Sequence, residues 1–258
     1  MANKITKIAR TGYIAKGVIY TITGMLTFMA ALNIGGEKAG KEEVLEFIEG
    51  QKLGSTLLIL LAAGLLSYAV WRFTQAIFDP EGKKFNKKKK NKGQRFALFI
   101  SGIAYVGLAG LAVIKSGSRS SSSSLKHSKI LTTEIGLWIL AAVGLIFIGR
   151  GFYQINRIFK TDFKKKFDFA SMHNEKRRKV IKNTAYMGMT SRAVIFLIIG
   201  YFAVKAAVNS NPSEIKNTSE AFSFIETSAF GSYLLGLVAI GFLGYAIYMF
   251  LSAKYRSF

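Results

Sequence analysis

Four basic side chains interrupt stretches of sequence that are otherwise almost entirely apolar, and they are the residues best suited to bind a ligand. Lys16 and Arg192 each stand alone in a long apolar run, about one and a half turns from the end expected to face the cytoplasm. Arg72 and Arg150 lie near the same ends of two other apolar runs. A charge inside a membrane is costly and usually marks a function. We therefore expect these four side chains to bind an anion or a lipid phosphate.

The same sequence is compatible with a second role for two of these cations and with two roles for the aromatic residues near them. The long stems of Lys16 and Arg192 also allow both cations to snorkel to the interface and to hold lipid phosphate there. The aromatic residues Tyr20, Tyr105 and Phe196 occupy corresponding positions in three similar segments. They either line a cavity beside the cations or serve as packing and interfacial residues. The sequence leaves both choices open.

The chain offers no set of residues for catalysis, for a metal or for a cofactor. It contains no cysteine and two histidines, His127 and His173, which lie in connections expected on opposite sides of a membrane. No phosphate-binding loop, serine-hydrolase motif or dinucleotide fingerprint occurs. We expect a protein that is not an enzyme and that holds no metal ion and no cofactor.

Six apolar segments would position the basic side chains in a membrane. They are residues 12–32, 53–71, 96–114, 135–153, 185–204 and 227–253. At a rise of ~1.5 Å per residue, segments of this length cross a hydrocarbon core of ~30 Å. None shows the polar face that a helix in a soluble core requires. The sequence therefore predicts an all-α membrane protein with six transmembrane helices.

The six segments also fall into three similar pairs. Residues 47–71 match residues 224–248 without a gap, so that Glu49 corresponds to Glu226 and Tyr68 to Tyr245. Ahead of them, residues 12–24 line up with residues 188–200, and a weaker copy lies within residues 101–153. Internal repetition of this kind determines architecture before chemistry.

We predict a single transmembrane bundle over residues 1–258, built from repeat units at about 1–82, 83–168 and 169–258. Each unit holds an even number of spans, so the three copies enter the membrane in the same direction. Parallel repeats are related by an axis along the membrane normal. The expected arrangement is three parallel two-helix repeats around a pseudo-three-fold axis.

Short amphipathic stretches connect the spans of the first and third units. Residues 44–48 and 222–225 place apolar side chains among glutamates. This pattern is typical of a helix that lies in the membrane interface with its apolar face toward lipid or toward the bundle. We expect two such helices at the outer interface.

The net charge of +22 is concentrated in alternate connections. The connection after the second segment contains the lysine run 87–90, and the connection after the fourth is also strongly basic. The positive-inside rule then places these connections and both termini in the cytoplasm. Neither connection shows a recognisable nucleic-acid-binding module, so we expect their charge to indicate topology and attraction to anionic lipid head groups.

The repeated residues resemble a known bacterial family, the membrane proteins described as domain of unknown function 1206. The similar residues are Arg10-x-Gly12-Tyr13-x-x-Lys16-Gly17-Val18-x-Tyr20-x-x-x-Gly24 and Phe230-Gly231-x-x-Leu234-Leu235, followed by Ala239, Gly241, Tyr245 and Tyr248. The resemblance covers nearly the whole chain, and the second copy departs most. It implies a six-span protein of the bacterial inner (cytoplasmic) membrane with three two-span repeats, and it brings no assigned activity.

Two classes of function fit this sequence. The first is a structural, lipid-interacting or partner-interacting helix bundle, with membrane lipids and their anionic head groups as partners. The second is a transporter or pore for a small anion or amphiphile that uses the intramembrane cations. We favour the first, because the spans are so poor in polar residues. The sequence predicts no nucleic-acid partner, and it allows a homo-oligomer.

The charge distribution generates a direct test of topology. A cysteine placed at Lys88, in this cysteine-free chain, is expected to stay unlabelled when intact cells meet a membrane-impermeant thiol reagent. A cysteine at Ser121, in a connection expected outside, serves as the labelled control. Labelling at position 88 from outside intact cells would contradict the predicted orientation.

Overall fold

The computed structural model describes residues 2–80, 92–117, 133–159, 167 and 174–256. The lysine run 87–90, His127 and His173 lie outside these ranges. The described long helices are α1 (Ala2–Ala31), α3 (Gly54–Ile77), α5 (Lys92–Ser116), α6 (Glu134–Phe159), α7 (Glu175–Val208) and α9 (Gly231–Tyr255). The described short helices are α2 (Lys41–Glu49), the single turn η4 (Pro212–Glu214) and α8 (Thr218–Glu226).

Each of the six long helices is long and apolar enough to cross a membrane. Each covers all or most of one of the apolar segments identified in the sequence, so the prediction of an all-helical protein with six candidate spans is confirmed. The largest difference is at the last segment, where α9 begins at Gly231, four residues after the predicted start. The first and fifth helices are longer than expected. α1 begins ten residues ahead of the predicted segment, at Ala2, and α7 likewise begins ten residues ahead of its segment, at Glu175.

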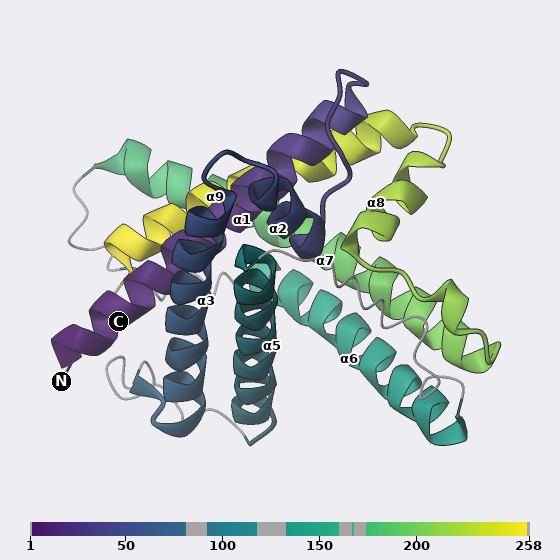
Figure 1. Ribbon diagram of the computed structural model, residues 1–258, viewed down its shortest axis with the longest axis horizontal. Coiled ribbons are helices and arrows are strands. Elements are labelled where there is room, and N and C mark those ends of the chain that lie inside the picture. The colour runs from purple at the N-terminus through teal and green to yellow at the C-terminus, as the bar shows by residue number, and fades with distance from the viewer. Residues whose placement is uncertain (1, 81–91, 118–132, 160–166, 168–173, 257–258) are drawn as a thin grey trace.

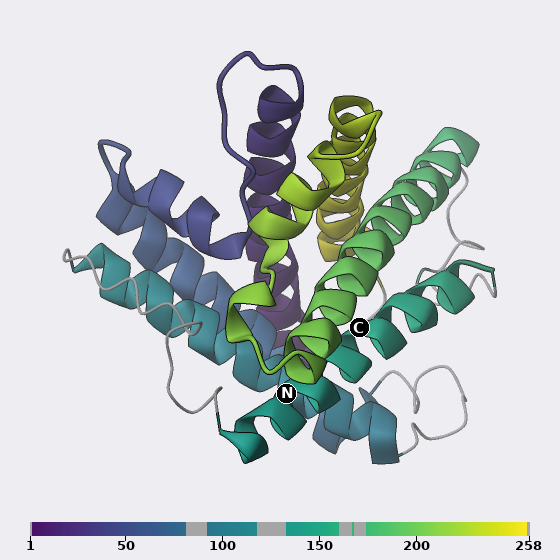
Figure 2. The same ribbon diagram turned by 90° about the vertical axis from the view of Figure 1, so that its right-hand side faces the viewer.

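The long helices associate in three pairs: α3 packs along α5, α6 along α7, and α1 along α9 (Figure 1). In Figure 2, α1 and α9 stand side by side in the middle, and the other two pairs slant away from them. α1 also packs on α3, and α9 packs on α7. Within the described residues, α5 and α6 do not pack along each other as these pairs do. The pseudo-three-fold arrangement therefore stays a prediction.

Two glycines allow the backbones of neighbouring helices to touch. A Cβ atom added to Gly12 of α1 would lie 2.5 Å from the Cα atom of Tyr68 in α3. A Cβ atom added to Gly188 of α7 would lie 2.5 Å from the Cα atom of Tyr245 in α9. Small residues permit such close packing of helices in membranes. The two contacts hold Tyr68 and Tyr245 firmly against α1 and α7.

The short helices pack their apolar faces against the long ones. Leu45 of α2 and Phe222 of α8 are completely buried. The Phe222 ring lies 5.5 Å from the ring of Phe242, near the middle of α9. Of the two coverings expected for the apolar faces of α2 and α8, lipid or the bundle, the structure shows the bundle. Lys115 at the end of α5 pairs with Glu46 and Glu49 of α2, each at 3.3 Å.

The glycine contacts predict a contrast between two substitutions. Gly188→Ala is expected to lower the apparent unfolding midpoint in detergent, because overpacking a tight contact typically costs ~1–3 kcal/mol. Gly110→Ala in α5 is the control, since nothing lies within 4 Å of a Cβ atom at that position. The control should leave the midpoint unchanged or raise it slightly. Equal midpoints for the two variants would contradict the described contact between α7 and α9.

Candidate functional site

Lys16 lies near the middle of α1, and its side chain points into the protein. The residue is 3% exposed, and its Nζ atom donates a hydrogen bond to the hydroxyl oxygen of Tyr68 at 3.2 Å. The Lys16 ammonium group is therefore directed at Tyr68 inside the bundle.

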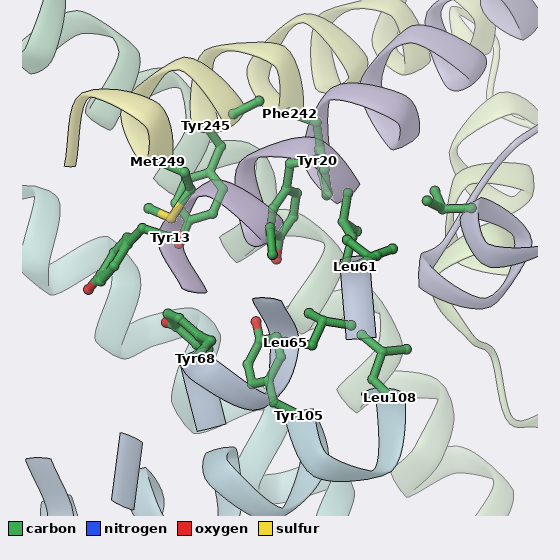
Figure 3. Close-up of a cluster of buried hydrophobic side chains, with 14 of the residues drawn as sticks. Tyr13, Tyr20, Leu61, Leu65, Tyr68, Tyr105, Leu108, Phe242, Tyr245 and Met249 are labelled. Atoms are coloured by element: carbon green, nitrogen blue, oxygen red, sulfur yellow. The ribbon is translucent and has the colours of Figure 1, made fainter. Parts of the chain in front are cut away.

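Four tyrosine rings surround the Lys16 ammonium group. Its Nζ atom lies 4.8 Å from the ring centroid of Tyr68, 5.4 Å from that of Tyr105, 5.6 Å from that of Tyr245 and 5.8 Å from that of Tyr20. The rings come from four helices, α3, α5, α9 and α1 (Figure 3). Figure 3 shows the hydroxyl groups of Tyr20 and Tyr105 pointing toward each other across the space between α1 and α5. Aromatic faces attract a cation at these distances.

Arg192 reaches the same tyrosines from α7. Its guanidinium carbon lies 4.4 Å from the ring centroid of Tyr245, 5.5 Å from that of Tyr20 and 5.2 Å from that of Phe196. Lys16 and Arg192 thus share Tyr20 and Tyr245, whose rings lie 4.7 Å apart. Two residues at corresponding positions of the sequence come together at one point in the bundle.

Arg72 and Arg150 complete the set that the sequence singled out. Arg72 donates hydrogen bonds to the Tyr68 hydroxyl and, at 3.2 Å, to Oε1 of Gln75. The guanidinium carbon of Arg150 lies 6.0 Å from the ring centroid of Phe196. The electrostatic fields of Arg192, Arg72 and Arg150 all act on Lys16. The structure therefore brings all seven predicted residues into one neighbourhood.

Three residues of the site were missed by reasoning from the sequence. Tyr68 and Tyr245 occupy matching places in the ungapped pair of segments, and that match was the signal that could have identified them. Lys41, the first residue of α2, had no such signal. Its Nζ atom lies 5.2 Å from the Tyr105 ring centroid because α2 dips toward the middle of α5.

Lys41 differs from Lys16 in its access to solvent. Burial lowers the pKa of Lys41, yet its side chain keeps exposed surface. Both statements hold for a side chain that is surrounded by protein but faces an accessible space. Arg150 is also exposed, whereas Arg192 and Arg72 are half-buried. Accessibility within the site thus decreases from Lys41 and Arg150 toward Lys16.

The five cations have no acidic partner in the part of the chain that the structure describes. No carboxylate lies within ion-pair distance of Lys16, Lys41, Arg72, Arg150 or Arg192 there. The Nε atoms of Arg72 and Arg192 are buried and have no hydrogen-bond partner among the described residues. The site therefore combines excess positive charge with phenolic hydroxyl donors, an arrangement suited to holding an anion.

Comparison with known proteins yields a family and one relative of similar length. The model of the family described as Domain of Unknown Function (DUF1206) matches residues 11–79 and 187–256. The chain is 28% identical over 255 residues to the uncharacterized protein YxxB of Bacillus subtilis (strain 168), an alignment that covers 98% of this chain and 91% of that protein. No solved structure matches.

The excess charge predicts an unusual effect of substitution. Lys16→Met is expected to raise the apparent unfolding midpoint of the ligand-free protein in neutral detergent. The variant relieves repulsion from four neighbouring cations, and apolar replacements of buried charged groups often stabilise by ~1–4 kcal/mol. Lys205→Met is the control, because Lys205 forms an ion pair with Glu214 at 3.1 Å near the end of α7. A midpoint below that of the parent would show that Lys16 is a structural residue.

Proposed function

We propose that this chain, which belongs to the family described as Domain of Unknown Function (DUF1206), is an integral membrane protein that binds an anionic group at the centre of its helix bundle. One observation carries the proposal: Lys16, Lys41, Arg72 and Arg192 contact four tyrosines, Arg150 lies beside Phe196 in the same site, and none of the five cations has a carboxylate partner among the described residues. The sequence favoured a structural, lipid-interacting or partner-interacting bundle, and the proposed site specifies an anionic group as what the bundle binds.

The physical argument rests on the cost of buried charge. An isolated charge in a medium of low dielectric is strongly unfavourable unless it is paired. Cation–π contacts with Tyr20 and Tyr245 offset part of this cost for Lys16 and Arg192. A bound anion would offset more, because it would neutralise charge and accept hydrogen bonds from guanidinium and phenolic groups. A phosphate group fits best, since the arginine fork matches its oxygen atoms.

The anion can come from two sources, a lipid head group or a free ion. A groove of about 300 Å³ lies between α1 and α3, the helices that carry Lys16 and Arg72, and supports the lipid source. Its lining is almost entirely apolar and includes Ile14, Val18, Leu57, Leu60 and Gly64. Such a groove accepts an acyl chain. Lys41 and Arg150, whose side chains keep exposed surface, support entrance of a free ion.

The proposal includes the membrane, the orientation and the repeats. Alternation of basic connections supports a bacterial inner membrane with both termini in the cytoplasm. Two features support two-helix repeats: the family model matches two separate regions, and the contact of Gly12 with Tyr68 has a counterpart in that of Gly188 with Tyr245. The pairing of α3 with α5, α6 with α7 and α9 with α1 supports a three-fold relation. These pairs join the first unit to the second, the second to the third and the third to the first.

The proposed role is binding and not catalysis. The side chains gathered at the site are cations and phenols, which hold an anion. Membrane lipids are the proposed partners, and the exposed apolar faces of α5 and α6 are compatible with a second copy of the chain.

The test uses the double variant Lys16→Gln/Arg192→Gln, with Lys38→Gln/Lys205→Gln as the matched control. The control cations pair with Glu226 and Glu214 away from the site. Loss of two charge-assisted contacts of ~1.5–3 kcal/mol each should weaken anion binding by at least about a hundredfold. Native mass spectrometry of gently extracted protein measures retained anionic lipid. Thermal stabilisation by added inorganic phosphate measures binding of the free ion.

The two measurements identify the source of the anion. A fall in retained lipid identifies a head group as the ligand, and a fall in stabilisation by phosphate identifies a free ion. If the site variant matches the control in both measurements, the proposed binding site is wrong.

A further inference from the structure

We infer that the central site is part of a path for small inorganic anions that enters the bundle at the exposed side chain of Lys41 and is closed, in this structure, at Arg256. The inference rests on the proposed anion binding and adds transport to it. The path is a row of cations separated by tyrosine rings: Arg256, Arg72, Lys16 and Lys41.

The row is continuous from ring to ring. The guanidinium carbon of Arg256 lies 5.0 Å from the ring centroid of Tyr13, which lies 5.5 Å from that of Tyr68. Arg72 and Lys16 both lie 4.8 Å from the Tyr68 centroid. The Tyr68 ring contacts the Tyr105 ring at 4.6 Å.

The row then continues toward α2. Lys16 and Lys41 lie 5.4 and 5.2 Å from the Tyr105 centroid. No step between neighbouring groups, from Arg256 to Lys41, therefore exceeds 5.5 Å.

The row begins at one end of the long helices and reaches the middle of the bundle. Arg256 directly follows the last residue of α9. Lys41 begins α2, which lies in the connection between α1 and α3, and its Nζ atom lies beside Tyr105, near the middle of α5. The row therefore joins the end of α9 to the exposed side of the central site. Positive side chains that line a passage are the usual basis of selectivity for anions.

Exposure along the row shows which end is closed. Lys41 keeps exposed surface, Lys16 is 3% exposed, and Tyr68 and Tyr13 are 1% and 2% exposed. Arg256, which is also buried, donates a hydrogen bond to the Tyr13 hydroxyl and forms an isolated β-bridge with Phe167. Tyr13 and Arg256 thus form a closing layer between the central site and the termini.

The dimensions of the row favour a small anion over an amphiphile. Between Arg256 and Lys16 the passage consists of tyrosine rings packed at 4.6–5.5 Å, and these rings leave no space for an acyl chain. Movement of Tyr13 would open a route lined by hydroxyl donors and positive charges. An inorganic oxyanion can exchange its water for such donors.

The experiment measures uptake of radiolabelled inorganic phosphate by neutral-lipid proteoliposomes that contain the full chain. Tyr13→Ala removes the ring of the closing layer and keeps every cation, so uptake should rise by about tenfold or more. Adding Lys16→Gln to this variant should return uptake to the parent rate, because the central cation is lost. Tyr233→Ala, at an exposed tyrosine near the start of α9, is the control and should leave uptake unchanged.

The outcomes separate this inference from the proposed function. If phosphate stabilises Tyr13→Ala but uptake does not rise, the path is wrong and the binding site stands. If phosphate does not stabilise the parent protein, free-anion binding fails and the path fails with it. A similar rise in Tyr233→Ala would show nonspecific leakage and overturn the path. If Tyr13→Ala does not fold, Arg256→Ala opens the same layer and carries the same expectations.

Discussion

Positive charge that is held among apolar helices must be stabilised by the helices themselves, and the centre of this bundle is arranged around that requirement. Lys16 and Arg192 lie near the middle of α1 and α7, and both charged groups lie beside the rings of Tyr20 and Tyr245. Tyrosine rings and hydroxyls from four helices supply part of the stabilisation. The rest of the stabilisation is missing in the described residues, and this deficit is the physical basis for expecting an anion.

The packing of the helices provides the rings in the right places. Gly12 and Gly188 let α3 and α9 approach so closely that the backbones at Tyr68 and Tyr245 touch α1 and α7. The two tyrosine rings then reach Lys16 and Arg192, which lie about one turn further along the helices that carry the glycines. A larger residue at either glycine would separate backbone from backbone and move a ring away from its cation. Tight helix packing and the cationic site therefore depend on the same contacts.

Stability and function oppose each other at this site. A ligand-free bundle gains nothing from five cations that repel one another, and an apolar core would pack more favourably. Proteins tolerate such local destabilisation where it provides binding or catalysis. Lys41 and Arg150 are exposed and Lys16 is buried, so the exposure of the cations decreases from one side of the site to the other. Binding and passage of anions both use the exposed side, and only passage needs the Arg256 end to open.

The sequence by itself determined the class of the protein and the identity of most of its unusual residues. Uninterrupted apolar length predicts six spans, because a helix in lipid satisfies its own backbone and needs only apolar side chains. A lone cation such as Lys16 or Arg192 stands out against that background without any knowledge of the fold. The ungapped match also marked Tyr68 and Tyr245, although not their role.

Only the tertiary structure decided where these residues meet. Lys16 is buried because side chains of α3, α5 and α9 surround it, and the sequence does not show which helices pack together. The meeting of Lys16 with Arg192 depends on the packing of α1 against α9 and of α9 against α7, contacts between residues far apart in the chain. Lys41 joins the site because α2 folds inward, and an amphipathic pattern shows which face is apolar but not whether lipid or protein covers it.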